Sequence, residues 1–160
     1  MKKAQLEQQF AMIFGVVVIV FVLIYGSYVI IKTIHLSSQI EFKDFLEKLD
    51  KEVIDCYNLD FGSICSLNKL EKPSNLDYIC FINKEEVLDE SKLPRNLNNT
   101  IIKFIRLNRD ENVFLNSLSS KGDLITKRID KLRASENPLC TKNIKNLVVE
   151  NKGTFVIIRT

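Results

Sequence analysis

The chain has 160 residues, of which 46% are hydrophobic and 27% are charged, and its formal net charge is +3 at pH 7. This length allows one domain with an appendage but not two full domains. Residues 10–31 contain no charged side chain, whereas the rest of the chain has the composition of an ordinary small soluble domain. The composition therefore argues against an all-soluble enzyme, a polytopic transporter and a low-complexity chain.

Residues 10–31, which read FAMIFGVVVIVFVLIYGSYVII, predict a single transmembrane helix. A helix of this length rises about 33 Å, close to the roughly 30 Å hydrocarbon core of a bilayer. A buried core helix of this length without a polar stripe is not expected in so small a protein, and the apolar region of a secretory signal is shorter, about 7–15 residues. Cleavage near Tyr25-Gly26-Ser27 by a signal peptidase remains the alternative. Membrane lipid is the first expected partner.

The charges that flank the span predict its orientation. Lys2 and Lys3 are concentrated in the nine-residue head (1–9), whereas Lys32 and the lysines after it are mixed with acidic residues. Because lysine and arginine favour the cytoplasmic side, we expect the amino terminus inside and the carboxyl-terminal domain outside the cell membrane.

Residues 32–58 have the spacing of an amphipathic helix that follows the span. The apolar side chains that set this spacing are Phe42, Phe45, Leu46, Leu49, Val53, Ile54 and Tyr57. No proline or glycine separates the span from this segment, so we expect a nearly continuous helix. A bend with a fresh helix start at Ser37 or Ser38 is the alternative.

Residues 59–160 predict a small, mostly β domain. Strands are expected at 77–83, 100–107, 112–118, 146–150 and 154–159, with hairpin turns at 108–111 and at 151–153, where Gly153 supplies a positive φ. Residues 123–134 fit either period. The predicted fold class is α+β: a long N-terminal transmembrane helix, an amphipathic continuation, and an antiparallel sheet of about four to six strands.

The four cysteines follow the span, as an oxidising exterior would permit. Among the three pairings that four cysteines allow, we favour Cys56 with Cys65 and Cys80 with Cys140. The intervals between them are 8, 14 and 59 residues, without a CxxC and without a nearby histidine, which argues against zinc. Free buried thiols in a cytosolic domain are the remaining alternative.

Other motifs give weaker indications. Asn98-Asn99-Thr100 is the one N-x-S/T sequence, in a segment expected to be a polar loop, and makes Asn98 a candidate glycan acceptor. The single imidazole, His35, is interpreted as an interfacial polar residue rather than a catalytic one. No catalytic, metal or cofactor site is expected.

Two charged segments are interpreted as solvated surface. The run from Glu85 to Glu90 lacks the pattern of a calcium loop. The cations between Lys127 and Arg133 are interrupted by Asp130 and read as an exposed helix face, and nucleic acid is not an expected partner.

The amino terminus resembles that of archaeal type IV pilin-like proteins. Lys3-Ala4-Gln5-Leu6 precedes an unbroken apolar helix, and the resemblance implies a leader of residues 1–4 that is cut between Ala4 and Gln5. Glu7 would then lie two residues nearer the mature start than the corresponding glutamate of bacterial pilins. The segments ICFIN, NVFL, PLC and ENKGTFVII also resemble small single-pass archaeal membrane proteins of unassigned function.

These patterns favour a membrane-anchored surface protein with a structural or interaction role, similar to a minor pilin and not an enzyme. The expected partners are lipid and, through the apolar helix, copies of the chain or other pilin-like subunits. The first alternative is an accessory or receptor-like binding module that does not polymerise. A membrane-tethered enzyme is the least favoured, because no catalytic group is apparent apart from His35.

Overall fold

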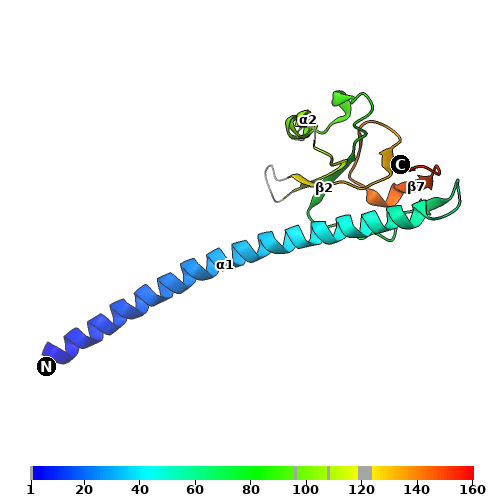
Figure 1. The fold of residues 1–160 in the computed structure, drawn as a ribbon. Coiled ribbons are helices and arrows are strands. Elements are labelled where there is room, and N and C mark those ends of the chain that lie inside the picture. The colour runs from blue at the N-terminus through cyan, green and yellow to red at the C-terminus, as the bar shows by residue number, and fades with distance from the viewer. Residues whose placement is uncertain (1, 96, 108, 119–123) are drawn as a thin grey trace. The chain divides into compact units, whose positions relative to one another are not determined.

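The computed structural model describes residues 2–95, 97–107, 109–118 and 124–160, with the backbone alone for 2–11, 34–36, 38 and 98. The chain divides into two compact units, Met1–Ile40 and Glu41–Thr160. Helix α1 (Lys2–Tyr57) supplies all the described structure of the first unit and the first element of the second (Figure 1). A helix assigned without a break at Ser37 agrees with the expectation of near-continuity.

In the first unit, the described side chains of Met12–Thr33 are predominantly apolar. Met12–Thr33 is a stretch of 22 residues that is long and apolar enough to cross a membrane, and none of it is buried in the structure. Two of its hydroxyls bond within the helix: Ser27 Oγ donates to the Leu23 oxygen at 2.7 Å, and Thr33 Oγ1 to the Val29 oxygen at 2.9 Å. Such internal bonds remove the cost of leaving these groups unpaired in lipid.

The described residues of the second unit form the remainder of α1, one short α-helix, two 3-10 helices and eight strands. The helical elements after α1 are η1 (Glu90–Lys92), α2 (Asn98–Arg106) and η2 (Ile144–Asn146). The strands are β1 (Ile64–Ser66), β2 (Leu76–Phe81), β3 (Val113–Ser117), β4 (Leu124–Lys127), β5 (Leu132–Ala134), β6 (Leu139–Thr141), β7 (Val148–Asn151) and β8 (Val156–Arg159).

These strands form two sheets rather than the single antiparallel sheet expected. The first has the order β1-β7-β8-β5, and its β5–β8 pair is parallel; the second has the order β4-β3-β2-β6 and is antiparallel throughout. The strands predicted at 77–83, 112–118, 146–150 and 154–159 correspond to β2, β3, β7 and β8. Strands β1 and β6 were not predicted, because three residues are too few to show a period.

The main core lies between Glu41–Tyr57 of α1 and the inner faces of both sheets. The helix contributes Phe42, Phe45, Leu46, Leu49, Val53 and Cys56, all buried. These residues recur at three- and four-residue intervals, so they occupy one side of the helix. Glu41 anchors the start of this segment, because its carboxylate accepts hydrogen bonds from the Ser74 main-chain N–H at 2.8 Å and from the Ser74 hydroxyl.

A smaller core lies on the other face of the second sheet, beneath α2. Cys80 and Phe114 face this side of β2 and β3, and Leu97 and Ile101 of the α2 segment pack against them. Figure 1 accordingly shows α2 across β2 from α1. The second sheet is therefore covered on both faces, which explains why β3 is buried at every residue.

The expectation of a strand at 100–107, joined by a turn to β3, is wrong. This segment is the body of α2, and Asn98, expected in a loop, begins that helix. Its β-branched and aromatic residues favour a strand, but Ile101, Phe104 and Ile105 have the i, i+3, i+4 spacing that only a helix brings to one side, against the small core. Residue 108 of the expected turn lies outside the described residues.

Candidate functional site

The first disulfide joins the end of α1 to β1. Cys56 and Cys65 are bonded with their Cα atoms 6.0 Å apart, and Cys56 Sγ also lies 3.4 Å from the Val149 oxygen of β7. The bridge fixes the last turn of the helix against the first sheet. This is one of the two pairings that the sequence analysis favoured.

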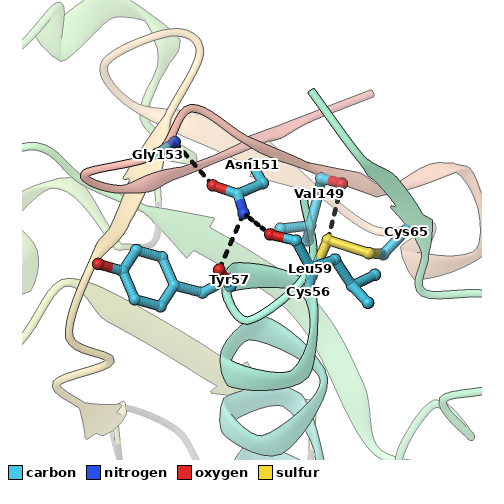
Figure 2. The surroundings of a disulfide bond; sticks show 7 residues. All are labelled: Cys56, Tyr57, Leu59, Cys65, Val149, Asn151 and Gly153. Atoms are coloured by element: carbon cyan, nitrogen blue, oxygen red, sulfur yellow. Dashed lines mark hydrogen bonds between the residues drawn. A yellow bond between two sulfur atoms is a disulfide. The ribbon is translucent and has the colours of Figure 1, made fainter. Parts of the chain in front are cut away.

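Asn151 closes the same corner, as Figure 2 shows. Its side-chain amide donates to the main-chain oxygens of Tyr57 at 2.8 Å and Leu59 at 2.7 Å, and its Oδ1 accepts from the Gly153 N–H at 2.7 Å. The last carbonyls of a helix lack partners within the helix, so Asn151 supplies a donor where α1 ends. Gly153, with a φ of 85°, makes the turn that the sequence analysis predicted between β7 and β8.

The second disulfide lies within the second sheet. Cys80 of β2 and Cys140 of β6 are directly opposite in the strand register, and their Cα atoms are 4.1 Å apart. This bridge is the other favoured pairing. It ties the short strand β6 to the centre of the sheet and belongs to the small core beneath α2.

Two asparagines join the sheets by occupying the outer edge of β5. Asn83, which is buried, donates from Nδ2 to the Ala134 oxygen at 2.8 Å and accepts at Oδ1 from the Ala134 N–H at 2.8 Å. Asn112 donates from Nδ2 to the oxygens of Ile129 and Leu132. The two amides therefore satisfy main-chain groups that an edge strand would otherwise leave open.

A cleft of about 400 Å³ lies beside this junction. Its lining includes Lys84, Glu85, Glu86, Asp110, Arg128, Asp130, Lys131, Arg133, Thr154 and Phe155. Arg133 lies over the Phe155 ring, 4.6 Å from its centroid, and pairs with Glu85 at 2.9 Å. The charges of both signs give the cleft no strong preference for either an anion or a cation.

The cations at 127–133 are part of this cleft and of its surroundings, not of a helix face. They lie on β4, on a loop and on β5, and each of three has an anionic partner: Lys127 pairs with Asp50 at 2.8 Å, Arg128 with Asp130 at 2.8 Å, and Arg133 with Glu85. The Asp130 carboxylate, hydrogen-bonded to the Arg128 guanidinium, raises the pKa of Arg128. Arg128, Lys131 and Arg133 are exposed as expected, but Lys127 is half-buried and the expected helix is wrong, because these residues lie on two strands and the loop between them.

The acidic run of 85–90 is held by internal contacts. Asn83 Nδ2 donates to Glu86 at 3.0 Å, and Asp89 accepts from the Ser91 hydroxyl at 2.6 Å. The Ser91 hydrogen bonds lower the pKa of the Asp89 carboxyl. Among the residues whose side chains are described, no three His, Cys, Asp or Glu side chains gather as a metal site requires.

The outer face of α2 carries a group of cations that the sequence analysis did not recognise. Lys103 and Arg106 are exposed, and Arg109 lies over the Phe104 ring at 5.2 Å. On the expected strand, Lys103 and Arg106 would have faced opposite ways, whereas three residues apart on a helix they share a side. The error in secondary structure thus concealed this basic face.

Several predicted residues lie outside the described side chains, namely Ala4, Gln5, His35 and Asn98. The backbone of Ala4 and Gln5 belongs to α1, and that of Asn98 begins α2. The peptidase site, the interfacial imidazole and the glycan acceptor stay predictions.

The comparisons with known proteins return nothing. No family model, no curated protein and no solved structure matches the chain.

Proposed function

We propose that the chain is a single-pass membrane protein that displays its disulfide-braced second unit at the cell surface, in a structural or interaction role like that of a minor pilin. The observation that carries this proposal is the fully exposed apolar run Met12–Thr33, on the same helix whose later residues build the core of a folded unit. Apolar surface of this extent requires lipid or protein around it.

The disulfides support the outward direction. Two bridges, Cys56–Cys65 and Cys80–Cys140, lie in the unit that follows the apolar run, each with one buried and one half-buried cysteine, and such bridges persist in oxidising surroundings. A secreted form, released by cleavage of the apolar helix as a signal sequence, would also be exposed to an oxidising environment. Retention of the protein in the membrane distinguishes the anchored form from the secreted form.

In the pilin-like role, the apolar helix exchanges lipid for the helices of neighbouring subunits. An all-round apolar surface suits both situations, because it has no polar stripe that a neighbour would have to satisfy. This role requires processing of the leader, residues 1–4, so that the mature chain begins at Gln5.

A receptor-like binding module is the second candidate, and the cleft between Lys84 and Phe155 is the observation that favours it. A hollow lined by both charge signs and one aromatic ring suits a polar ligand with limited apolar surface. In this case the apolar helix serves as an anchor alone, and residues 1–4 are retained. We propose no catalytic role for either candidate.

Mass determination of the amino terminus, on protein extracted from membranes, tests these roles. A start at Gln5 supports the pilin-like role, and a start at Met1 contradicts it in favour of the anchored module. A start near Ser27, with the protein in the soluble fraction, contradicts membrane anchoring altogether. Protease treatment of intact cells checks the orientation, since an outward domain is digested and an inward one is protected.

A further inference from the structure

Strand β1 is an edge strand, and among the described residues its only strand partner is β7. It is the terminal strand of the first sheet, opposite β5, whose own edge is occupied by Asn83 and Asn112. Proteins usually protect such edges with charged side chains, proline or a covering segment. β1 itself contains only Ile64, Cys65 and Ser66.

The register determines which main-chain groups are free. Asn151 N–H donates to the Ser63 oxygen and Leu67 N–H to the Leu147 oxygen, so residues 63, 65 and 67 face β7. Because hydrogen-bonding direction alternates along an antiparallel strand, the N–H and C=O groups of Ile64 and Ser66 point away from β7. We call this side of Ile64–Ser66 the free edge of β1.

Exposed apolar side chains surround the free edge. Ile64 is 59% exposed and Phe61, in the turn before the strand, is 77% exposed, while Leu59 is exposed as well. Both Ile64 and Ser66 project from the outer face of the sheet, because Cys65 between them points inward to its disulfide. An edge with open main-chain groups and adjoining apolar surface is suited to pairing with another strand.

We propose that the free edge of β1 pairs antiparallel with β1 of a second copy of the chain, about a two-fold axis at Cys65. In this register Ile64 of each copy lies opposite Ser66 of the other, and each such pair exchanges two main-chain hydrogen bonds. The free main-chain groups of Ile64 and Ser66 in both copies are thereby all hydrogen-bonded, with the same strand sequence on each side. An isologous contact of this kind closes with two copies.

Charge also favours a second copy in the antiparallel direction. Asp60 precedes the strand and Lys69 follows it, and both are exposed. Antiparallel pairing brings Asp60 of each copy toward Lys69 of the other, whereas parallel pairing brings like charges together. The contact between the two copies is small. The proposal therefore rests on the proposed function in one respect: anchoring in one membrane raises the effective concentration of the two copies.

The test uses the full chain in liposomes, with a benzophenone amino acid in place of Phe61 and an equal mixture of isotopically light and heavy protein. Irradiation should give crosslinked dimers in which position 61 of one copy is joined to the strand β1 region of the other. The same probe at Leu107, the residue that follows α2 and is 59% exposed, is the matched control and should give few dimers.

Ser66→Pro gives the decisive comparison. Proline removes an N–H that faces away from β7, so the variant keeps the pairing of β1 with β7 but cannot complete the pairing between copies. We expect the dimer yield to fall about tenfold or more, while Ser66→Ala leaves it unchanged. Peptide mapping under non-reducing conditions verifies that Cys56 and Cys65 remain linked in Ser66→Pro.

A second pair of variants tests the pairing independently, in case the proline variant misfolds. The double substitution Ile64→Lys with Ser66→Lys places like charges opposite each other across the edge and should also lower the yield. Mixing it with Ile64→Glu, Ser66→Glu protein should restore the heavy–light dimer. Failure of this rescue overturns the proposal.

Two further results would overturn it: wild-type protein that gives no dimer, or dimers that survive in Ser66→Pro and map elsewhere. Flotation of the same liposomes reports on the anchor separately. If the chain floats with the liposomes but Ser66→Pro does not lower the dimer yield, only the β1 pairing is contradicted. If the chain does not float, membrane anchoring is contradicted. The dimer yields of wild type and Ser66→Pro, compared at about 100 μM protein in solution, then still test the pairing.

Discussion

The side-chain amide of Asn151 donates a hydrogen bond of 2.8 Å to the main-chain oxygen of Tyr57, the last residue of α1. The two residues are 94 positions apart in the sequence. The end of the helix is therefore stabilised by a strand near the carboxyl terminus, beside the disulfide that holds the same turn. This contact gives the first testable prediction.

Replacing Asn151 by alanine should lower the free energy of unfolding by about 2–4 kcal/mol, because two carbonyls at the end of α1 lose their donor in a buried corner. Denaturant unfolding with both disulfides intact measures the loss. Asn143→Ala is the control: Asn143 is exposed and its Oδ1 accepts only from the Lys145 N–H, so the cost should stay below about 1 kcal/mol. Equal losses in the two variants would contradict the role of Asn151.

Replacing Asn83 by alanine should expose the edge of β5. The Ala134 N–H loses its acceptor, and we expect its hydrogen exchange to become about tenfold faster or more. Asn112→Ala is the matched variant, since Asn112 Oδ1 accepts from the Ile129 N–H at 2.8 Å. It should accelerate exchange at Ile129 more than at Ala134. The prediction fails if both variants affect the two amides alike.

The two disulfides should differ in their contribution to stability. Cys80 and Cys140 are separated by 60 positions and Cys56 and Cys65 by 9. In the chain-entropy account a longer closed loop constrains the unfolded chain more, by about 1.7 kcal/mol here. Cys80→Ala with Cys140→Ala should therefore lower the unfolding free energy by roughly that much more than Cys56→Ala with Cys65→Ala. The reverse order in urea unfolding would contradict the loop-length account.

Glu150 should make the stability depend on acid pH. Its contact with Lys152, which is a close hydrogen-bonded ion pair, lowers the pKa of the Glu150 carboxyl below its usual range. A carboxyl whose pKa is lower in the folded state stabilises the fold above its unfolded pKa, and this contribution disappears as the pH falls through the folded pKa. Glu150→Gln should thus be less stable than the wild type at pH 7.

The stabilities of the same two proteins should converge as the pH falls through the lowered pKa of the folded Glu150 carboxyl, because the wild-type side chain then becomes protonated. Thermal unfolding at a series of pH values from pH 7 downward measures the difference. Asp44→Asn is a useful control, because Asp44 is exposed on the surface of α1 and, among the described side chains, forms an ion pair with Lys48, one turn away. A difference between wild type and Glu150→Gln that is constant across this series would show that Glu150 acts by packing rather than by charge.

Sequence patterns predicted those parts of the fold that depend on long or clearly periodic segments. The apolar run, the amphipathic half of α1 and the strands β2, β3, β7 and β8 were all placed from local periods. The turn at Gly153 followed from its conformational freedom. The disulfide pairing could be predicted because four cysteines allow three pairings.

The rest depends on contacts that local patterns do not contain. TIIKFIRL is rich in β-branched and aromatic residues, which favour a strand, but its residues Ile101, Phe104 and Ile105 pack as one side of a helix against the small core beneath α2. The parallel pair of the first sheet involves β5, a three-residue strand beside β8 that is too short to show a period. The amide contacts of Asn83 and Asn112 link residues about 17 to 51 positions apart, so no sequence window reveals them.

The placement of Phe42, Leu49 and Cys56 in the main core has a practical consequence for cutting the chain. A truncation at residue 58, just after α1 ends, would remove the longest helix from the main core. It would also leave Cys65 without its disulfide partner, Cys56. A soluble fragment should instead begin at or just before Glu41, because it then retains the last part of α1, about 4.7 turns long, that packs against the sheets.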